Sequence, residues 1–168
     1  MKGQKLESTL GSCNERQQSV IHAAAANGHV RVLTALDEIK DRAKLNFEKQ
    51  DVDGKTAAWI AAENGKANVL EYFVKESKSK PDIKTPDKLG RTPAWIAAKN
   101  AHVNVLEVLN DLVGKDLLAT ADQAGVTPAH VAAKYGHAKV IQCPCVILRN
   151  YFCYLAMMLP LVCLLQID

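Results

Sequence analysis

The stretch TAAWIAAENGKANVL, residues 56–70, decides the fold, because residues 92–106 repeat it as TPAWIAAKNAHVNVL. Ten of the fifteen positions are identical at a spacing of 36 residues, and the two tryptophans of the chain occupy the same position. An internal repeat with a period between about 20 and 50 residues is typical of stacked, solenoid-like proteins. The sequence therefore predicts a stack of similar units.

Two fainter copies of this stretch extend the pattern toward both ends of the chain. Residues 19–33 read SVIHAAAANGHVRVL and residues 127–141 read TPAHVAAKYGHAKVI, each with a histidine where the other copies have tryptophan. Successive copies begin 37, 36 and 35 residues apart, at Ser19, Thr56, Thr92 and Thr127. We therefore predict four repeats.

Each copy has the features of a short helix, a tight stop and a second helix. Thr92-Pro93 and Thr127-Pro128 suit a helix start, because Thr caps the first turn and Pro needs no backbone donor there. The alanine pairs that follow favour helix and close approach of a neighbour, so we expect them to be buried. These alanines are Ala61, Ala62, Ala97, Ala98, Ala132 and Ala133.

Glycines and turn signals punctuate the copies. Gly28, Gly65 and Gly136 stand where a left-handed helix stop is expected, and Ala101 replaces glycine in the third copy. Apolar residues at helical spacing then predict a second, longer helix. Turn signals precede three of the copies, at Asp53-Gly54, Leu89-Gly90 and Ala124-Gly125. The first copy has NERQ at residues 14–17 instead, so we expect it to lack this turn.

The combined pattern Asp-x-x-Gly-x-Thr-Pro-x-x-x-Ala-Ala-x-x-Gly-His resembles the ankyrin repeat. Residues 122–137, DQAGVTPAHVAAKYGH, meet it almost in full, while residues 87–102 and 51–66 miss one or two positions. The resemblance implies an all-α, ankyrin-like solenoid of stacked helix-turn-helix repeats with β-turn or hairpin loops. The spacing exceeds the ~33 residues usual for this repeat, and the surplus lies after the second helix, as in KESKSKPDIKTP.

The domain organisation follows from where the repeats begin and end. We expect a polar N-terminal segment at residues 1–17 and a repeat domain at 18–142, with repeats that start near 18, 51, 87 and 122. An apolar, cysteine-rich tail occupies residues 143–168.

The resemblance implies a protein–protein interaction module, an adaptor or scaffold that binds a partner protein through the concave face of the stack. The residues expected to meet the partner are those beside each turn and those just before each helix stop. They are Val52, Asp53, Lys55, Glu63, Asn64, Lys88, Leu89, Arg91, Lys99, Asn100, Gln123, Ala124, Val126, Lys134 and Tyr135. Trp59 and Trp95 replace a histidine that ties neighbouring ankyrin repeats by hydrogen bonds. The indoles either pack in the same position or offer an aromatic contact to a partner.

Composition and motifs narrow the function further. The net charge of +3, with basic and acidic residues interspersed, argues against nucleic acid as a partner. No histidines or cysteines have a zinc-like arrangement, and acidic residues such as Asp37 and Glu38 are most simply solvated. We expect no enzyme activity, no cofactor and no metal, and we expect a monomer. No cysteine lies between residues 14 and 142 and no apolar leader is present, which favours a reduced, cytoplasmic setting.

The C-terminal tail has three possible explanations. Nineteen of the 23 residues from Cys143 to Leu165 are apolar, and Pro144 interrupts the last expected helix. A membrane anchor over residues ~146–165 would make the chain the ankyrin-like cytosolic portion of a membrane-attached channel or transferase, although the unbroken apolar run falls short of the ~20 residues required. A cap on the last repeat is the second explanation. Read-through of a truncated or misassembled coding region is the third, and the abrupt change in composition favours it.

Overall fold

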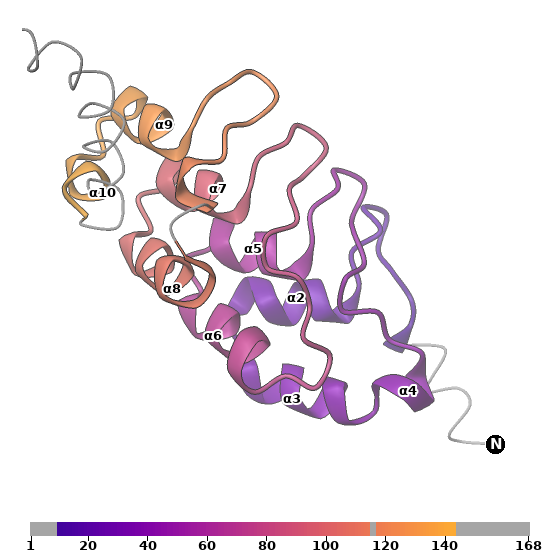
Figure 1. Ribbon diagram of the computed structural model, residues 1–168. Helices are drawn as coiled ribbons and strands as arrows, with labels where there is room; N and C mark the ends of the chain where they lie inside the picture. Colours follow the sequence, from indigo (N-terminus) through magenta and orange to yellow (C-terminus); the bar gives the residue numbers. More distant parts are fainter. Residues whose placement is uncertain (1–9, 115–116, 144–168) are drawn as a thin grey trace, which may run out of the picture.

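The computed structural model describes residues 10–114 and 117–143, and these residues form helices and turns without a β-strand (Figure 1). Four helix pairs follow one another along the chain. They are α2 (Val20–Asn27) with α3 (Val30–Glu38), α5 (Ala57–Glu63) with α6 (Ala67–Lys75), α7 (Pro93–Lys99) with α8 (Val103–Val113), and α9 (Pro128–Lys134) with α10 (Ala138–Gln142). A short helix, α4 (Lys40–Ala43), and a 3₁₀ turn, Leu117–Ala119, lie in the connections after α3 and α8.

The helix pairs stack in two rows. The inner helices α2, α5, α7 and α9 lie side by side, the outer helices α3, α6, α8 and α10 form a second row, and the turns project from the stack (Figure 1). Ala61, Ala62, Ala97 and Ala98 are fully buried. Their small side chains let neighbouring inner helices approach closely, which confirms the all-α, ankyrin-like solenoid.

The inner helices begin as the sequence predicts. The Thr56 hydroxyl accepts a hydrogen bond from the backbone N–H of Trp59, and the Thr92 hydroxyl accepts one from Trp95, both at 3.2 Å. Pro93 and Pro128 occupy the first turn of α7 and α9. The two threonine caps stabilise the first turns of α5 and α7, because each hydroxyl accepts from a backbone N–H that has no partner within the helix.

The helix stops lie in the left-handed region, where glycine is favoured. The φ angles are 76° at Gly28, 70° at Gly65 and 74° at Gly136. Ala101 has the same conformation, with a φ of 60°. The third repeat therefore keeps the geometry of its neighbours although its side chain makes that conformation costly.

The first repeat forms the turn that we expected it to lack. Asp51 accepts hydrogen bonds from the backbone N–H groups of Asp53 and Lys55, and Asn14 accepts equivalent bonds from Arg16 and Gln18. Gln17 stands in place of the turn glycine, at a φ of 60°. The prediction was wrong because an asparagine amide oxygen accepts the same two bonds as an aspartate, so NERQ builds the same turn.

The surplus residues after α6 fold around Asp37, which is buried rather than solvated as we expected. Its carboxylate accepts bonds from the Ser77 hydroxyl at 2.8 Å, the Lys78 backbone N–H at 2.6 Å and the Ser79 hydroxyl. Burial alone would raise the pKa of Asp37, but these donors lower it by more, so the pKa lies below its usual value. The lengthened connection is therefore an ordered part of the stack.

The last repeat differs from the expected burial at one alanine. Ala132 is fully buried against the preceding repeat, as predicted, whereas Ala133 is exposed. The expectation for Ala133 assumed a neighbour on both sides of α9, and among the described residues only α7 packs against it as an inner helix.

No helix within residues 10–114 and 117–143 is long and apolar enough to cross a membrane. The tail beyond Cys143, with the anchor suggested near residues 146–165, lies outside the described residues.

Candidate binding face

The fifteen residues expected to meet a partner define a surface that we call the turn-and-inner-helix face. None of them is buried. Their two groups, beside the turns and at the ends of the inner helices, meet in the second repeat, where Lys55 Nζ lies 3.1 Å from Glu63 Oε1. The turn and the helix end of one repeat therefore contribute to the same surface.

Exposed apolar side chains gather on this face. Only four large apolar residues are exposed in the described part of the chain: Val32, Val52, Leu89 and Tyr135. Three of them, Val52, Leu89 and Tyr135, belong to the turn-and-inner-helix face, with Leu89 and Tyr135 at 54% and 49% exposure. Apolar side chains that are exposed in several repeats of one face give that face apolar points at which another protein can make contact.

The two tryptophans lie beneath this face and join neighbouring repeats. The indole N–H of Trp59 donates to the backbone carbonyl of Arg91 at 2.8 Å, and that of Trp95 donates to Val126 at 3.0 Å. Both side chains are buried. Of the two explanations for these residues, the structure supports packing between repeats, and the hydrogen bond accounts for the choice of an aromatic ring with a donor.

His22 fills the same position in the first repeat and uses it in the same way. Its Nε2 lies 3.2 Å from the Lys55 carbonyl, while its Nδ1 faces the backbone N–H of Ser19 at 3.2 Å. A carbonyl can only accept and an N–H can only donate, so the ring carries its proton on Nε2. Burial lowers the pKa of His22 below its usual value, because the charged ring would lose its contact with water.

Two further histidines join successive repeats near the helix stops. His102 Nε2 lies 3.0 Å from the Glu63 carbonyl, and His137 Nε2 lies 2.8 Å from the Lys99 carbonyl. These bonds hold the ends of the inner helices in register from one repeat to the next. In the described part of the chain, no group of three His, Cys, Asp or Glu side chains is placed to hold a metal ion.

Cations lie over aromatic rings along the face. Lys55 Nζ is 4.2 Å from the ring centroid of Trp59, and Arg91 lies between the tryptophans, with Cζ 5.8 Å from Trp59 and 5.6 Å from Trp95. Lys99 Nζ is 5.7 Å from the ring of Tyr135. These contacts hold the basic groups at the surface while their stems cover the aromatic rings.

Some members of the face already serve the stack. Asn64 donates its side-chain amide to the Ile60 carbonyl of its own helix at 2.9 Å. Asn100 donates to the Glu63 carbonyl of the preceding repeat at 2.9 Å, and Gln123 donates to the Lys88 carbonyl at 3.1 Å. Sequence patterns place these amides on the face, but only the folded chain reveals that the donors of Asn100 and Gln123 tie neighbouring repeats together.

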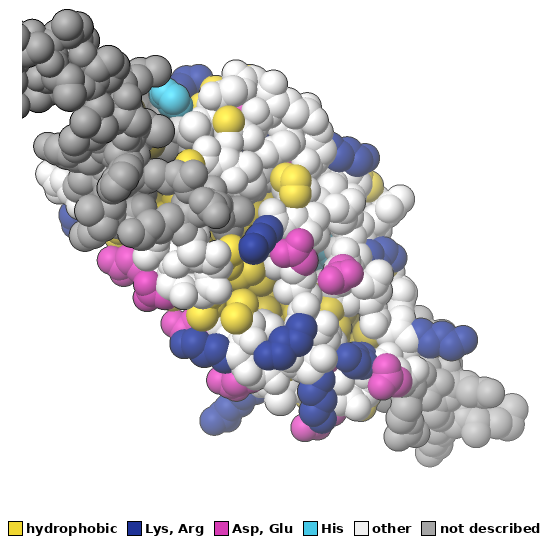
Figure 2. Space-filling model, viewed as in Figure 1, with side chains coloured by type: hydrophobic (Ala, Val, Ile, Leu, Met, Phe, Trp, Pro, Cys, Tyr) yellow, Lys and Arg dark blue, Asp and Glu magenta, His cyan; other side chains and the backbone are white. Residues whose placement is uncertain are grey.

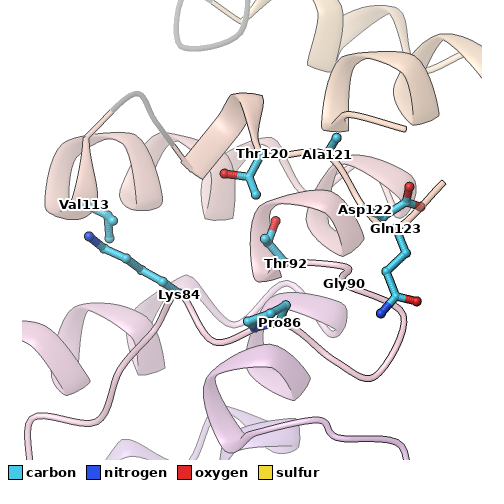
Figure 3. Close-up of a pocket in the computed structure, with 9 residues that line it drawn as sticks. All are labelled: Lys84, Pro86, Gly90, Thr92, Val113, Thr120, Ala121, Asp122 and Gln123. Atoms are coloured by element: carbon cyan, nitrogen blue, oxygen red, sulfur yellow. The ribbon is translucent and has the colours of Figure 1, made fainter. Parts of the chain in front are cut away.

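A hollow of about 490 Å³ lies between the connections that lead into the third and fourth repeats (Figure 3). Lys84 extends toward Val113 at one end of it, whereas Asp122 and Gln123 lie at the other end. Asp122 Oδ1 accepts hydrogen bonds from the backbone N–H groups of Ala124 and Val126 at 2.9 Å. The polar groups do not converge on one point, so we assign no chemistry to this hollow.

Charges of both signs are interspersed over the side of the molecule shown in Figure 2.

A family model described as ankyrin repeats matches the chain in three overlapping segments, residues 4–85, 21–117 and 79–143. Each segment spans more than one helix pair, and together they cover well over half of the chain. Comparison with curated proteins gives no match.

Proposed function

This chain belongs to the ankyrin repeat family, and on that premise we propose that it binds another protein through its turn-and-inner-helix face. Ankyrin repeats are generally protein–protein interaction modules. A stack of this kind presents a continuous surface to a partner, because each repeat adds its turn and the end of its inner helix to those of its neighbours.

One observation carries the proposal: three of the four large apolar side chains that are exposed in the described part of the chain lie on this face. Val52 and Leu89 stand beside the turns of the second and third repeats, and Tyr135 stands at the end of α9. A few residues, most often Trp, Tyr and Arg, supply most of the binding energy of an interface, and Tyr135 is of this type. Cations held over aromatic rings add polar contacts beside these anchors.

Photo-crosslinking from single positions tests the proposal. A photoreactive phenylalanine derivative replaces Leu89 or Tyr135 on the face, and Val32 on the outer helix α3 is the matched control because its side chain is 47% exposed. Irradiation in cells is expected to join one and the same protein to both face positions and not to the control. Crosslinks from position 32 alone, or identical products from all three positions, would contradict the proposal.

A further inference from the structure

The basic residues of the turn-and-inner-helix face are unevenly distributed along the stack. In the second repeat its members include one lysine, Lys55, and two acids, Asp53 and Glu63. In the third and fourth repeats its members include four basic residues and no acid. These four are Lys88, Arg91, Lys99 and Lys134. The two halves of one face therefore differ in charge.

The acids of the second repeat are neutralised within the protein. Asp53 Oδ2 accepts a bond from Arg16 Nη2 at 2.8 Å, and Glu63 Oε1 lies 3.1 Å from Lys55 Nζ. Each acid therefore has its own cation, and this half of the face carries little free charge.

Three of the four basic residues that the face has in the third and fourth repeats lack such a pair among the described residues. Lys99 in the third repeat and Lys134 in the fourth occupy the position that Glu63 occupies in the second repeat. Lys88, Lys99 and Lys134 take part in no ion pair within residues 10–114 and 117–143, whereas Arg91 Nε is bonded to Asp87 at 2.7 Å. Three lysines on one face therefore keep their charge available to another molecule.

Two exposed apolar residues, Leu89 and Tyr135, are adjacent to these lysines in the sequence. Leu89 follows Lys88 at the turn, and Tyr135 follows Lys134 at the end of α9. The Tyr135 ring stacks on His137 with centroids 6.2 Å apart, and Lys99 lies over it. Its ring is thus held in place yet half-exposed. A fixed ring beside lysines without an ion pair suits a partner that carries an apolar side chain between carboxylates.

We propose that the third and fourth repeats bind an acidic segment of the partner protein, in which Asp or Glu residues flank an apolar side chain. This inference rests on the proposed function and specifies the partner's chemistry. The carboxylates would lie against Lys88, Lys99 or Lys134, and the apolar side chain would contact Leu89 or Tyr135.

Selection from a random 12-residue peptide library on the full chain tests this proposal. We expect the enriched peptides to carry Asp or Glu beside an apolar residue, and we would measure their dissociation constants by fluorescence anisotropy. The double reversal Lys99→Glu/Lys134→Glu should weaken binding at least about tenfold, since it places like charges opposite one another. The control Arg31→Glu/Lys139→Glu makes the same change in net charge at exposed positions of the outer helices α3 and α10. It should leave the dissociation constant within about twofold, because these two exposed side chains belong to the outer helices rather than to the face and their charge is screened by salt.

Two results separate the failure of this proposal from that of the proposed function. If the selected peptides are neutral and crosslink to the photoreactive residue at positions 89 and 135, the proposal of an acidic partner segment is overturned, whereas the proposed binding face is supported. Peptides that crosslink only to position 32 on α3 would overturn both. A single-stranded oligonucleotide that competes as well as the selected peptides, and loses affinity in the same double reversal, would show a general anion site and would also overturn the acidic peptide.

Discussion

The third and fourth repeats carry nearly the same inner helix, PAWIAAK in α7 and PAHVAAK in α9, in different surroundings. Trp95 and Ala98 of α7 are buried, whereas the matching His130 and Ala133 of α9 are exposed. The inner helices α5 and α9 pack on either side of α7, and among the described residues only α7 packs in this way against α9. Burial in a stack is therefore decided by the next repeat as much as by the motif itself.

The largest effect is expected from a charge placed at the matched alanines. Ala98→Glu should lower the free energy of unfolding by at least about 3 kcal/mol, because it buries an unpaired carboxylate between α7 and its neighbours. Ala133→Glu should change it by less than about 0.5 kcal/mol, because that position is exposed. Urea unfolding followed by circular dichroism measures both. Equal losses in the two variants would mean that α9 is covered as fully as α7.

A smaller effect is expected from removing the hydrogen bond that Trp95 of the third repeat makes to the fourth repeat. Trp95→Phe keeps an aromatic ring but leaves the Val126 carbonyl without the donor it has at 3.0 Å, so we expect a loss of about 1–2 kcal/mol. Among the described residues His130 makes no bond to a following repeat, so His130→Phe loses the exposed contact of Nδ1 with the Thr127 hydroxyl at 2.8 Å and should have a smaller effect. The same unfolding measurement applies. A loss in Trp95→Phe no greater than in His130→Phe would argue that the indole stabilises through packing alone.

Exchanging the residues at the two helix stops should shift stability in opposite directions. Ala101→Gly should stabilise the chain by up to ~1 kcal/mol, since it relieves a side chain at a φ of 60°. Gly136→Ala should destabilise by about the same amount, because an added Cβ would have no neighbouring atom within 4 Å and only the backbone strain changes. Thermal unfolding checks both. Destabilisation by Ala101→Gly would show that the third repeat needs the alanine side chain.

The last prediction extends the comparison to the first repeat, where the next repeat covers His22. It concerns how the stability of the chain depends on pH below neutrality. The folded state lowers the pKa of His22, so the unfolded chain binds the proton more readily. This contribution to stability is complete above the ordinary histidine pKa of about 6.5 and is lost as the pH falls below it. Unfolding midpoints between pH 7.5 and 5.5 should therefore decline more steeply in the natural chain than in His22→Gln. Parallel declines would exclude His22 as the source.

Much of this architecture could be predicted from the sequence because its signals are local. The Thr caps of α5 and α7 and the left-handed stops at Gly28, Gly65 and Ala101 depend on interactions within a few residues of each position. None of the fifteen positions named from the repeat pattern is buried, because the period places each of them at an equivalent position in its repeat.

Other features depend on contacts between distant residues, which one sequence does not reveal. Asp37 became buried because Ser77 and Ser79, about 40 residues later, surround it with donors. Asn14 forms the turn in place of an aspartate because the turn requires a side-chain oxygen that accepts two backbone hydrogen bonds and does not require a charge. The indole N–H groups of Trp59 and Trp95 donate to backbone carbonyls of the next repeat. A repeat pattern alone does not identify these acceptors.

The sequence by itself determined the repeat period, the helix boundaries and the positions that recur on one face, because caps, stops and small side chains act over a single turn or unit. Only the tertiary structure decided which copy of each residue is buried, bonded or exposed. Ala98 and Ala133 have the same neighbours in sequence, yet α9 covers one, and no inner helix among the described residues covers the other. The physical reason is that the burial of a side chain in a stack depends on the side chains that the adjoining repeat supplies.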